Sequence, residues 1–123
     1  MATTKTVFLN LESGQYMSWL ISTQAAYASN TVLKDDKQVY FNYDNKPSDA
    51  QVICGQGKIT GANLRLEVTI PKATTILMAE STGELVTSPD GEVVGYTRAY
   101  AFEDGGDSDF SDVMVSIITH KKN

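Results

Sequence analysis

The sequence has little of the cysteine on which disulfide scaffolds and many catalytic sites depend. Of its 123 residues only one is cysteine, Cys54. A single cysteine excludes an internal disulfide and any metal site built from several thiolates. Cys54 lies between Ile53 and Gly55 and has no recognisable catalytic partner in the pattern, so we expect a small buried apolar side chain there rather than a nucleophile.

Histidine is equally scarce, and this argues against an enzyme. The only histidine, His120, stands three residues from the end beside two lysines, where a solvated tail residue is expected rather than a general base. The sequence contains no Gly-x-Ser-x-Gly elbow, phosphate-binding loop or zinc-ligand spacing. Two acids can replace histidine in a glycosidase, but they must face each other across a cleft, whereas the acids here gather in one turn.

Positive charge and long apolar runs are also in short supply. Lysine and arginine number 10 against 15 acids, which gives a net charge of −5, so phosphate backbones and anionic membranes are poor partners and nucleic-acid binding is disfavoured. No apolar run approaches the roughly eighteen residues that span a bilayer, so no membrane insertion is expected. The opening residues lack the apolar stretch of a signal peptide, which predicts cytoplasmic synthesis. A role at the cell surface or outside would need a non-classical export route.

What the sequence has in abundance is short alternating stretches bounded by turn residues. The clearest is 63–70, in which apolar residues at even positions alternate with polar ones, as in a strand with one buried face. Gly55 and Gly57 predict a bulge within another such stretch. The stretches interpreted as strands are 4–11, 15–22, 38–44, 50–60, 63–70, 74–80, 84–87, 92–102 and 113–119.

The region 15–28 allows two interpretations. Read with a period of two, Met17, Trp19 and Ile21 share one face of a strand; read with a period of 3.6, the region forms a helix capped by Ser13. We favour the strand because everything after it is β-like.

Residues 22–37 are small, polar and irregular, and predict a long loop. The resulting eight or nine short strands, without repeat or linker, predict a single all-β domain over residues 1–123. Its expected architecture is an antiparallel β-sandwich, jelly-roll-like or Greek key.

The stretch 103–112, Glu-Asp-Gly-Gly-Asp-Ser-Asp-Phe-Ser-Asp, contains five acids and no base. Carboxylates packed this densely repel one another unless a cation lies among them. Calcium takes about six to eight oxygen ligands, and Gly105 and Gly106 let the backbone fold round an ion. Neither the EF-hand loop nor the RTX nonapeptide matches. A calcium site and a plain solvated turn therefore both remain open.

The pattern Glu-Asp-Gly-x-Asp-x-Asp-x-x-Asp, followed by an alternating apolar strand, resembles the calcium-mediated fucose- and mannose-binding bacterial lectins of the PA-IIL type. The resemblance is confined to the C-terminal acidic loop and last strand. It implies a β-sandwich without catalytic activity, two adjacent Ca²⁺ ions in the loop, and sugar hydroxyls that complete their coordination. In that family the chain ends in a glycine, whereas this one ends Lys121-Lys122-Asn123.

The resemblance also implies roles for individual residues. The metal ligands it implies in the loop are Glu103, Asp107, Asp109, Ser111 and Asp112, and Ser111 departs from the asparagine of the family. The sugar-contacting residues are Asp104, Asp107 and Asp109. The family has a further ligand, an asparagine after the second strand. Asn30 is the candidate for it, and residues 22–24 fit as well.

Two binding functions follow. In the first, the protein is a calcium-dependent lectin that recognises a carbohydrate, with exposed aromatics such as Tyr27 or Phe110 stacking on the sugar. In the second, the ion only stabilises a structural or adhesive module that binds a protein partner. Because small sandwich lectins gain avidity by self-association, we expect a homo-oligomer.

Overall fold

The computed structural model describes residues 3–11, 13–24, 27–46, 50–81, 83–104 and 112–120. The strands in them are β1 (Thr3–Phe8), β2 (Tyr16–Thr23), β3 (Ser29–Lys34), β4 (Val39–Asn45), β5 (Gln51–Lys58), β6 (Arg65–Ile70), β7 (Leu77–Glu80), β8 (Glu84–Thr87), β9 (Val93–Glu103) and β10 (Val113–His120). Within this described part, no helix has the length and apolar character needed to cross a membrane.

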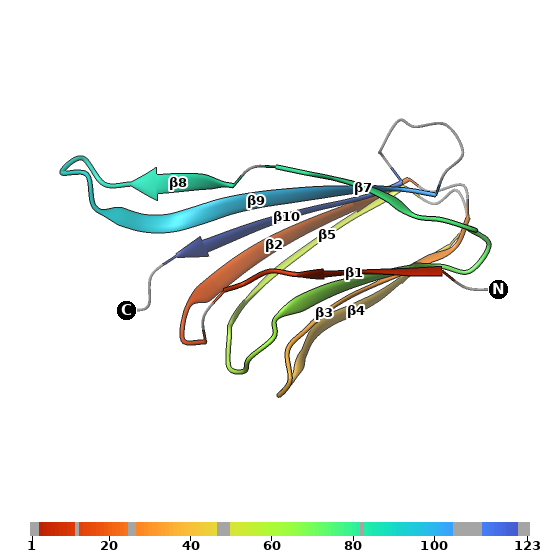
Figure 1. The fold of residues 1–123 in the computed structure, drawn as a ribbon, viewed down its shortest axis with the longest axis horizontal. Coiled ribbons are helices and arrows are strands. Elements are labelled where there is room, and N and C mark those ends of the chain that lie inside the picture. The colour runs from red at the N-terminus through yellow and green to blue at the C-terminus, as the bar shows by residue number, and fades with distance from the viewer. Residues whose placement is uncertain are drawn as a thin grey trace.

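The strands form two antiparallel sheets that lie face to face (Figure 1). Sheet A has the order β1-β6-β3-β4, and sheet B has the order β5-β2-β10-β9-β7, with β8 also pairing with β9. The connections β1–β2, β2–β3, β4–β5, β5–β6 and β6–β7 pass from one sheet to the other. This arrangement confirms the all-β antiparallel sandwich that the turn spacing predicts.

The core lies between the sheets, because alternate residues of each strand point inward. In β10 every odd-numbered residue is buried and every even-numbered one is exposed. The strand interpretation of 15–22 is confirmed, since Met17, Trp19 and Ile21 are all buried in β2. The Trp19 ring packs against Tyr40 and Phe41 of β4, with ring centroids 6.4 and 5.5 Å away, and so joins the two sheets.

The prediction of a loop over 22–37 was wrong for residues 29–34, which form β3 between β4 and β6. With this strand the described residues form ten strands rather than the expected eight or nine. The inward positions of β3 are Ser29, Thr31 and Leu33, all buried. Two of the three are polar, so an apolar alternation is missing and the sequence pattern is that of a loop.

Two expectations for β5 were also wrong. The strand pairs with β2 from Tyr16↔Lys58 to Thr23↔Gln51 without a register shift, so no bulge occurs in that ladder. Gly55 instead makes room for the indole of Trp19, because a Cβ at this position would lie 2.7 Å from the ring. Cys54 is exposed rather than buried, since it points to the outside of sheet B.

Candidate metal site

Three acids meet where β9 ends and β10 begins. The two strands pair up to Val113↔Phe102, so the next step of the register sets Asp112 opposite Glu103. Asp104 follows directly in the chain. A ligand oxygen from each of the three carboxylates lies within 4.8 Å of the others. The local β-structure therefore gathers these acids on rigid strand ends.

The cluster is withdrawn from water. Glu103 is 0% exposed and Asp112 is 7% exposed. The backbone N–H of Asp104 donates a 2.8 Å hydrogen bond to Asp112 Oδ2. Burial, the hydrogen bond shared with Glu103 and the nearby negative charges raise the pKa of Asp112 to about 7. The Asp112 carboxyl is therefore partly protonated near neutral pH. A bound cation would favour its ionised form and so offset the free energy that ionisation costs here.

A third strand reaches the same place. β2 pairs with β10 up to Val113↔Thr23, and the backbone N–H of Gln24 then donates a 3.0 Å hydrogen bond to the carbonyl of Asp112. Gln24 belongs to the segment 22–24 that the sequence offered as an alternative to Asn30. The end of β2 therefore lies beside the backbone of Asp112.

The structure does not bring Asn30 to these acids. Asn30 lies on β3, and its side chain is on the outer face of sheet A, away from sheet B. Its amide donates hydrogen bonds of 2.7 Å to Asn42 Oδ1 and 2.8 Å to Asp44 Oδ1 of the neighbouring strand. These contacts hold the Asn30 side chain against β4 of sheet A.

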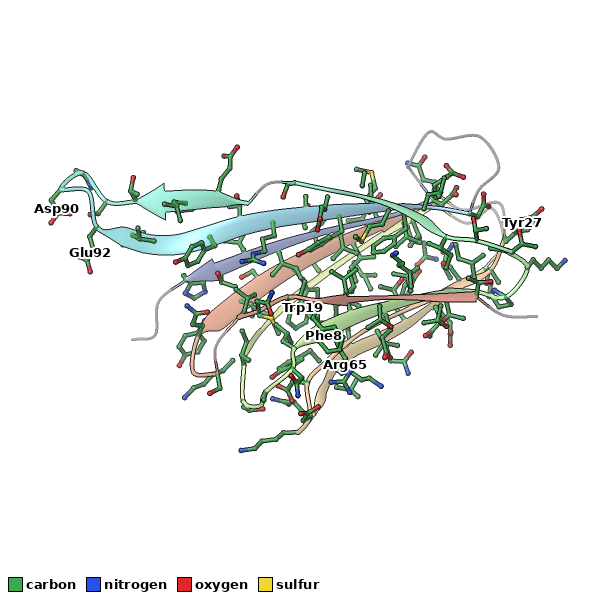
Figure 2. All side chains as sticks on the ribbon, viewed as in Figure 1. Phe8, Trp19, Tyr27, Arg65, Asp90 and Glu92 are labelled. Atoms are coloured by element: carbon green, nitrogen blue, oxygen red, sulfur yellow. The ribbon has the colours of Figure 1, made fainter. Side chains whose placement is uncertain are left out.

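The other residues of the acidic loop named above, Asp107, Asp109, Phe110 and Ser111, lie outside the described residues. Tyr27 is exposed at the same end of the molecule as the cluster, whereas Asp90 and Glu92 lie at the opposite end (Figure 2).

Comparison with known proteins gives matches among solved structures only; no protein-family model and no curated protein sequence matches the chain. The C-terminal domain of the Burkholderia cenocepacia lectin BC2L-C matches with a TM-score of 0.63 at 19% identity, over 96% of this chain and 97% of that one. The Chromobacterium violaceum lectin CV2L, in complex with α-methyl-fucoside, matches with a TM-score of 0.60 at 13% identity, over 88% and 90% of the two chains.

A high-affinity mannose-binding lectin of Ralstonia solanacearum matches with a TM-score of 0.61 at 12% identity, over 88% of this chain and 90% of that one. The chain has the fold of these bacterial lectins. The sequence shows this resemblance only in its last part. The solved structures confirm it as a likeness of fold over most of the chain. At such identities the likeness concerns the fold, and function must be argued from the site.

Proposed function

We propose that the protein is a lectin, without enzymatic activity, that binds a carbohydrate through Ca²⁺ held where β9 ends and β10 begins. The observation that carries this proposal is the convergence of three carboxylates within 4.8 Å on paired strands. The fold supports it, because solved structures with this fold include lectins in complex with α-methyl-fucoside and with high affinity for mannose.

The donor chemistry of the site fits calcium. Carboxylate oxygens are hard ligands, and three carboxylates supply up to six oxygens, close to the roughly six to eight that Ca²⁺ takes. Burial and the neighbouring carboxylates raise the pKa of Asp112, and a cation bound beside them would act in the opposite direction. A bound Ca²⁺ would supply positive charge among these acids, and a pair of sugar hydroxyls would occupy coordination positions that the protein leaves open.

The burial of each residue decides which role we assign to it. We assign the ion to Glu103 and Asp112, which are both buried, and the contact with the sugar to Asp104, which is half-buried. Asp107, Asp109 and Ser111 remain the proposed donors from the acidic loop. We assign the additional ligand position to the segment 22–24, where Gln24 contacts Asp112, in preference to Asn30.

The test is a calorimetric titration with Ca²⁺, followed by fucose, mannose and galactose in the same cell. Asp112→Asn keeps the shape of the side chain and removes its charge, so it should weaken calcium binding at least tenfold and abolish the sugar response. Asp90→Asn, in the exposed turn before β9, is the matched control and should leave both responses unchanged. If calcium produces no heat at any concentration, the proposal is wrong.

One observation favours a second function, in which the ion is purely structural. Glu103 is completely buried, and the cluster joins the ends of β9, β10 and β2, so an ion there would tie three strands together. Calcium binding without any sugar response would support this alternative. The search for a ligand would then turn to protein partners of a structural or adhesive module.

A further inference from the structure

Three connections between strands line an open cavity of about 640 Å³, the loop cavity, at the end of the sandwich that lies away from the acidic cluster. The β1–β2 connection contributes Leu11 and Ser13, the β3–β4 connection contributes Lys37, and the β5–β6 connection contributes residues 60–63. The volume lies within the range of roughly 300–1,000 Å³ that is usual for small-molecule sites. The loop cavity is therefore large enough for a ligand of its own.

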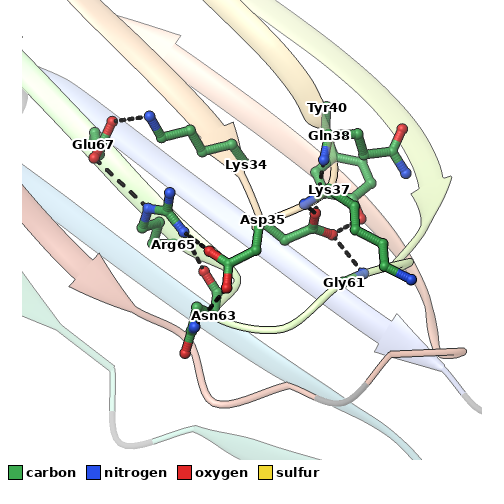
Figure 3. A network of polar contacts seen from close by, with 10 residues as sticks. Lys34, Asp35, Lys37, Gln38, Tyr40, Gly61, Asn63, Arg65 and Glu67 are labelled. Carbon is green, nitrogen blue, oxygen red and sulfur yellow. Dashed lines mark hydrogen bonds and ion pairs between the residues drawn. The ribbon is translucent and has the colours of Figure 1, made fainter.

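Hydrogen bonds between the three connections fix the walls of the loop cavity. The buried carboxylate of Asp35 accepts hydrogen bonds from the backbone N–H groups of Lys37 and Gly61, and so joins two of the connections (Figure 3). The third is attached by the backbone N–H of Gly14, which donates a 2.7 Å hydrogen bond to the carbonyl of Ile59. A cavity whose walls are already fixed loses less conformational entropy when a ligand binds.

Backbone strain is concentrated in the same connections. In the described part of the chain, the two non-glycine residues with a positive φ are Asn10, at 53° in the β1–β2 connection, and Asn63, at 60° in the β5–β6 connection. This left-handed conformation is unfavourable for a residue with a Cβ, and residues held in it cluster at ligand sites. Of the two, Asn63 lines the loop cavity and Asn10 does not.

The polar side chains of the lining keep hydrogen-bonding capacity for a ligand. Thr60 Oγ1 accepts a 2.7 Å hydrogen bond from Gln38 Nε2 and lies 3.4 Å from the Tyr40 hydroxyl, so the hydroxyl proton of Thr60 can still be donated to a ligand. The Asn63 side chain contacts Asp36 through Nδ2, and within the described residues its Oδ1 accepts no hydrogen bond. The lining thus offers both donors and acceptors, as the hydroxyl groups of a sugar require.

Lys37 is the one charged residue among the described residues that line the loop cavity. Its side chain runs beside Gly61, because a Cβ built on Gly61 would lie 3.0 Å from Lys37 Cγ. Lys34 forms an ion pair with Glu67 at 3.1 Å, whereas Lys37 has no ion-pair partner within the described part of the chain. A single unpaired ammonium group in a neutral polar lining suits a ligand with one carboxylate.

We propose that the loop cavity binds an acidic saccharide, a sugar that carries a carboxylate, independently of the candidate calcium site. Lys37 pairs with the carboxylate, and the uncharged polar side chains of the lining bind the sugar hydroxyls. Leu11 and Ala62 provide apolar surface for the C–H groups of the sugar ring.

The lining is less suited to other small ligands. A phosphate is normally held by several cations or by free backbone N–H groups, but the N–H of Gly61 already binds Asp35. The described lining residues include no acid, so a ligand amine would lack a counter-charge. They also include no aromatic ring on which a nucleobase could stack. A carboxylate on a hydroxyl-rich ring is the chemistry that remains.

The experiment is an NMR titration of the ¹⁵N-labelled full chain with glucuronic acid in the presence of chelator. Because no calcium is available, its outcome is independent of the calcium-dependent function proposed above. Saturable shifts are expected at the backbone amides of Lys37 and residues 60–63, and none at Glu103 or Asp112. Glucose, which has the ring without the carboxylate, should bind several-fold more weakly, and acetate should give no saturable shift. Equal binding of glucose or acetate, shifts only at the acidic cluster, or no saturable shift with glucuronic acid would overturn the proposal.

Two matched pairs of variants test the assignment of residues. Lys37→Gln should weaken glucuronic acid several-fold and leave glucose unchanged, whereas Lys72→Gln, at an exposed lysine in the turn after β6, should change neither. Asn63→Gly and Asn10→Gly relax the same backbone conformation, so both should fold, which circular dichroism checks. Asn63→Gly should weaken both sugars, and Asn10→Gly should weaken neither. Equal effects within either pair would overturn the proposal.

Discussion

At the scale of single residues, the packing of β5 against β2 depends on the lack of a side chain at Gly55. Gly55 pairs with Trp19, and a Cβ built on Gly55 would approach the indole to 2.7 Å. Gly57, two residues on along the same strand, would place a Cβ 3.5 Å from Tyr40, which is ordinary contact. The two glycines therefore look equivalent in the sequence and differ in the structure.

We expect Gly55→Ala to destabilise the fold by about 1–3 kcal/mol, because the indole of Trp19 must move in a packed core. Gly57→Ala should be neutral or slightly stabilising, since alanine reduces the entropy of the unfolded chain without a clash. Urea unfolding, followed by tryptophan fluorescence, measures both. Equal urea midpoints for Gly55→Ala and Gly57→Ala would show that the close approach of Trp19 to Gly55 does not affect stability.

At the scale of elements, one buried carboxylate joins two turns of the sandwich (Figure 3). Asp35, 4% exposed, follows β3 and accepts hydrogen bonds from the backbone N–H groups of Lys37 at 2.7 Å, Gln38 at 2.9 Å and Gly61 at 2.9 Å. The Tyr40 hydroxyl donates a further bond. Burial opposes ionisation, but these four donors together hold the pKa of Asp35 below its usual range.

We expect Asp35→Ala to cost about 2–4 kcal/mol, because it removes the acceptor that joins the β3–β4 and β5–β6 connections and leaves the buried Gly61 N–H without it. Because the pKa of Asp35 is lower folded than unfolded, its contribution is present above the ordinary aspartate value, about 3.9. It is lost as pH falls through the folded value. Asp36→Ala, at the exposed neighbouring acid, is the control and should change little. Urea midpoints at pH 7 and below pH 4 give the comparison, and equal losses from both variants would contradict the prediction.

The strands differ in how far their sequences reveal them. The sequence pattern reveals β6 because the inward residues of this strand are all apolar. It does not reveal β3, because Ser29 and Thr31 occupy inward positions there. Among the described residues their hydroxyl oxygens have no hydrogen-bond partner, so tertiary position and not local preference places them in the core. Period-two analysis finds strands whose buried face is apolar and misses those whose buried face is polar.

At the scale of the whole molecule, the candidate site shows where sequence reasoning ends. A strand on each side of the acidic stretch already implies that Glu103 and Asp112 face each other across a hairpin. The neighbour from β2 depends on the register between strands nearly a hundred residues apart, which no local pattern contains. Gln24 and Asn30 were therefore indistinguishable until the fold placed one beside Asp112 and the other on the opposite sheet.

The same cluster makes the stability of the whole fold depend on pH in a direction opposite to that of Asp35. Because the pKa of Asp112 is about 7 when folded, above its unfolded value, its contribution is complete below about pH 4 and is lost as pH rises through 7. The difference corresponds to at most about 4 kcal/mol. In chelator, we therefore expect the melting temperature to fall between pH 5 and 8, and Asp112→Asn to flatten that fall.

Calcium should reverse this trend, because the ion binds the ionised carboxylates that the empty fold disfavours. At a concentration one hundred times its dissociation constant, a ligand of the folded state adds about 2.7 kcal/mol of stability. The melting temperature in calcium should thus exceed that in chelator by a margin that widens from pH 5 to 8, since protons compete for Asp112 at the lower end. Parallel curves with and without calcium would place the ion elsewhere. A margin that disappears in Asp112→Asn but persists in Asp90→Asn would locate it between β9 and β10.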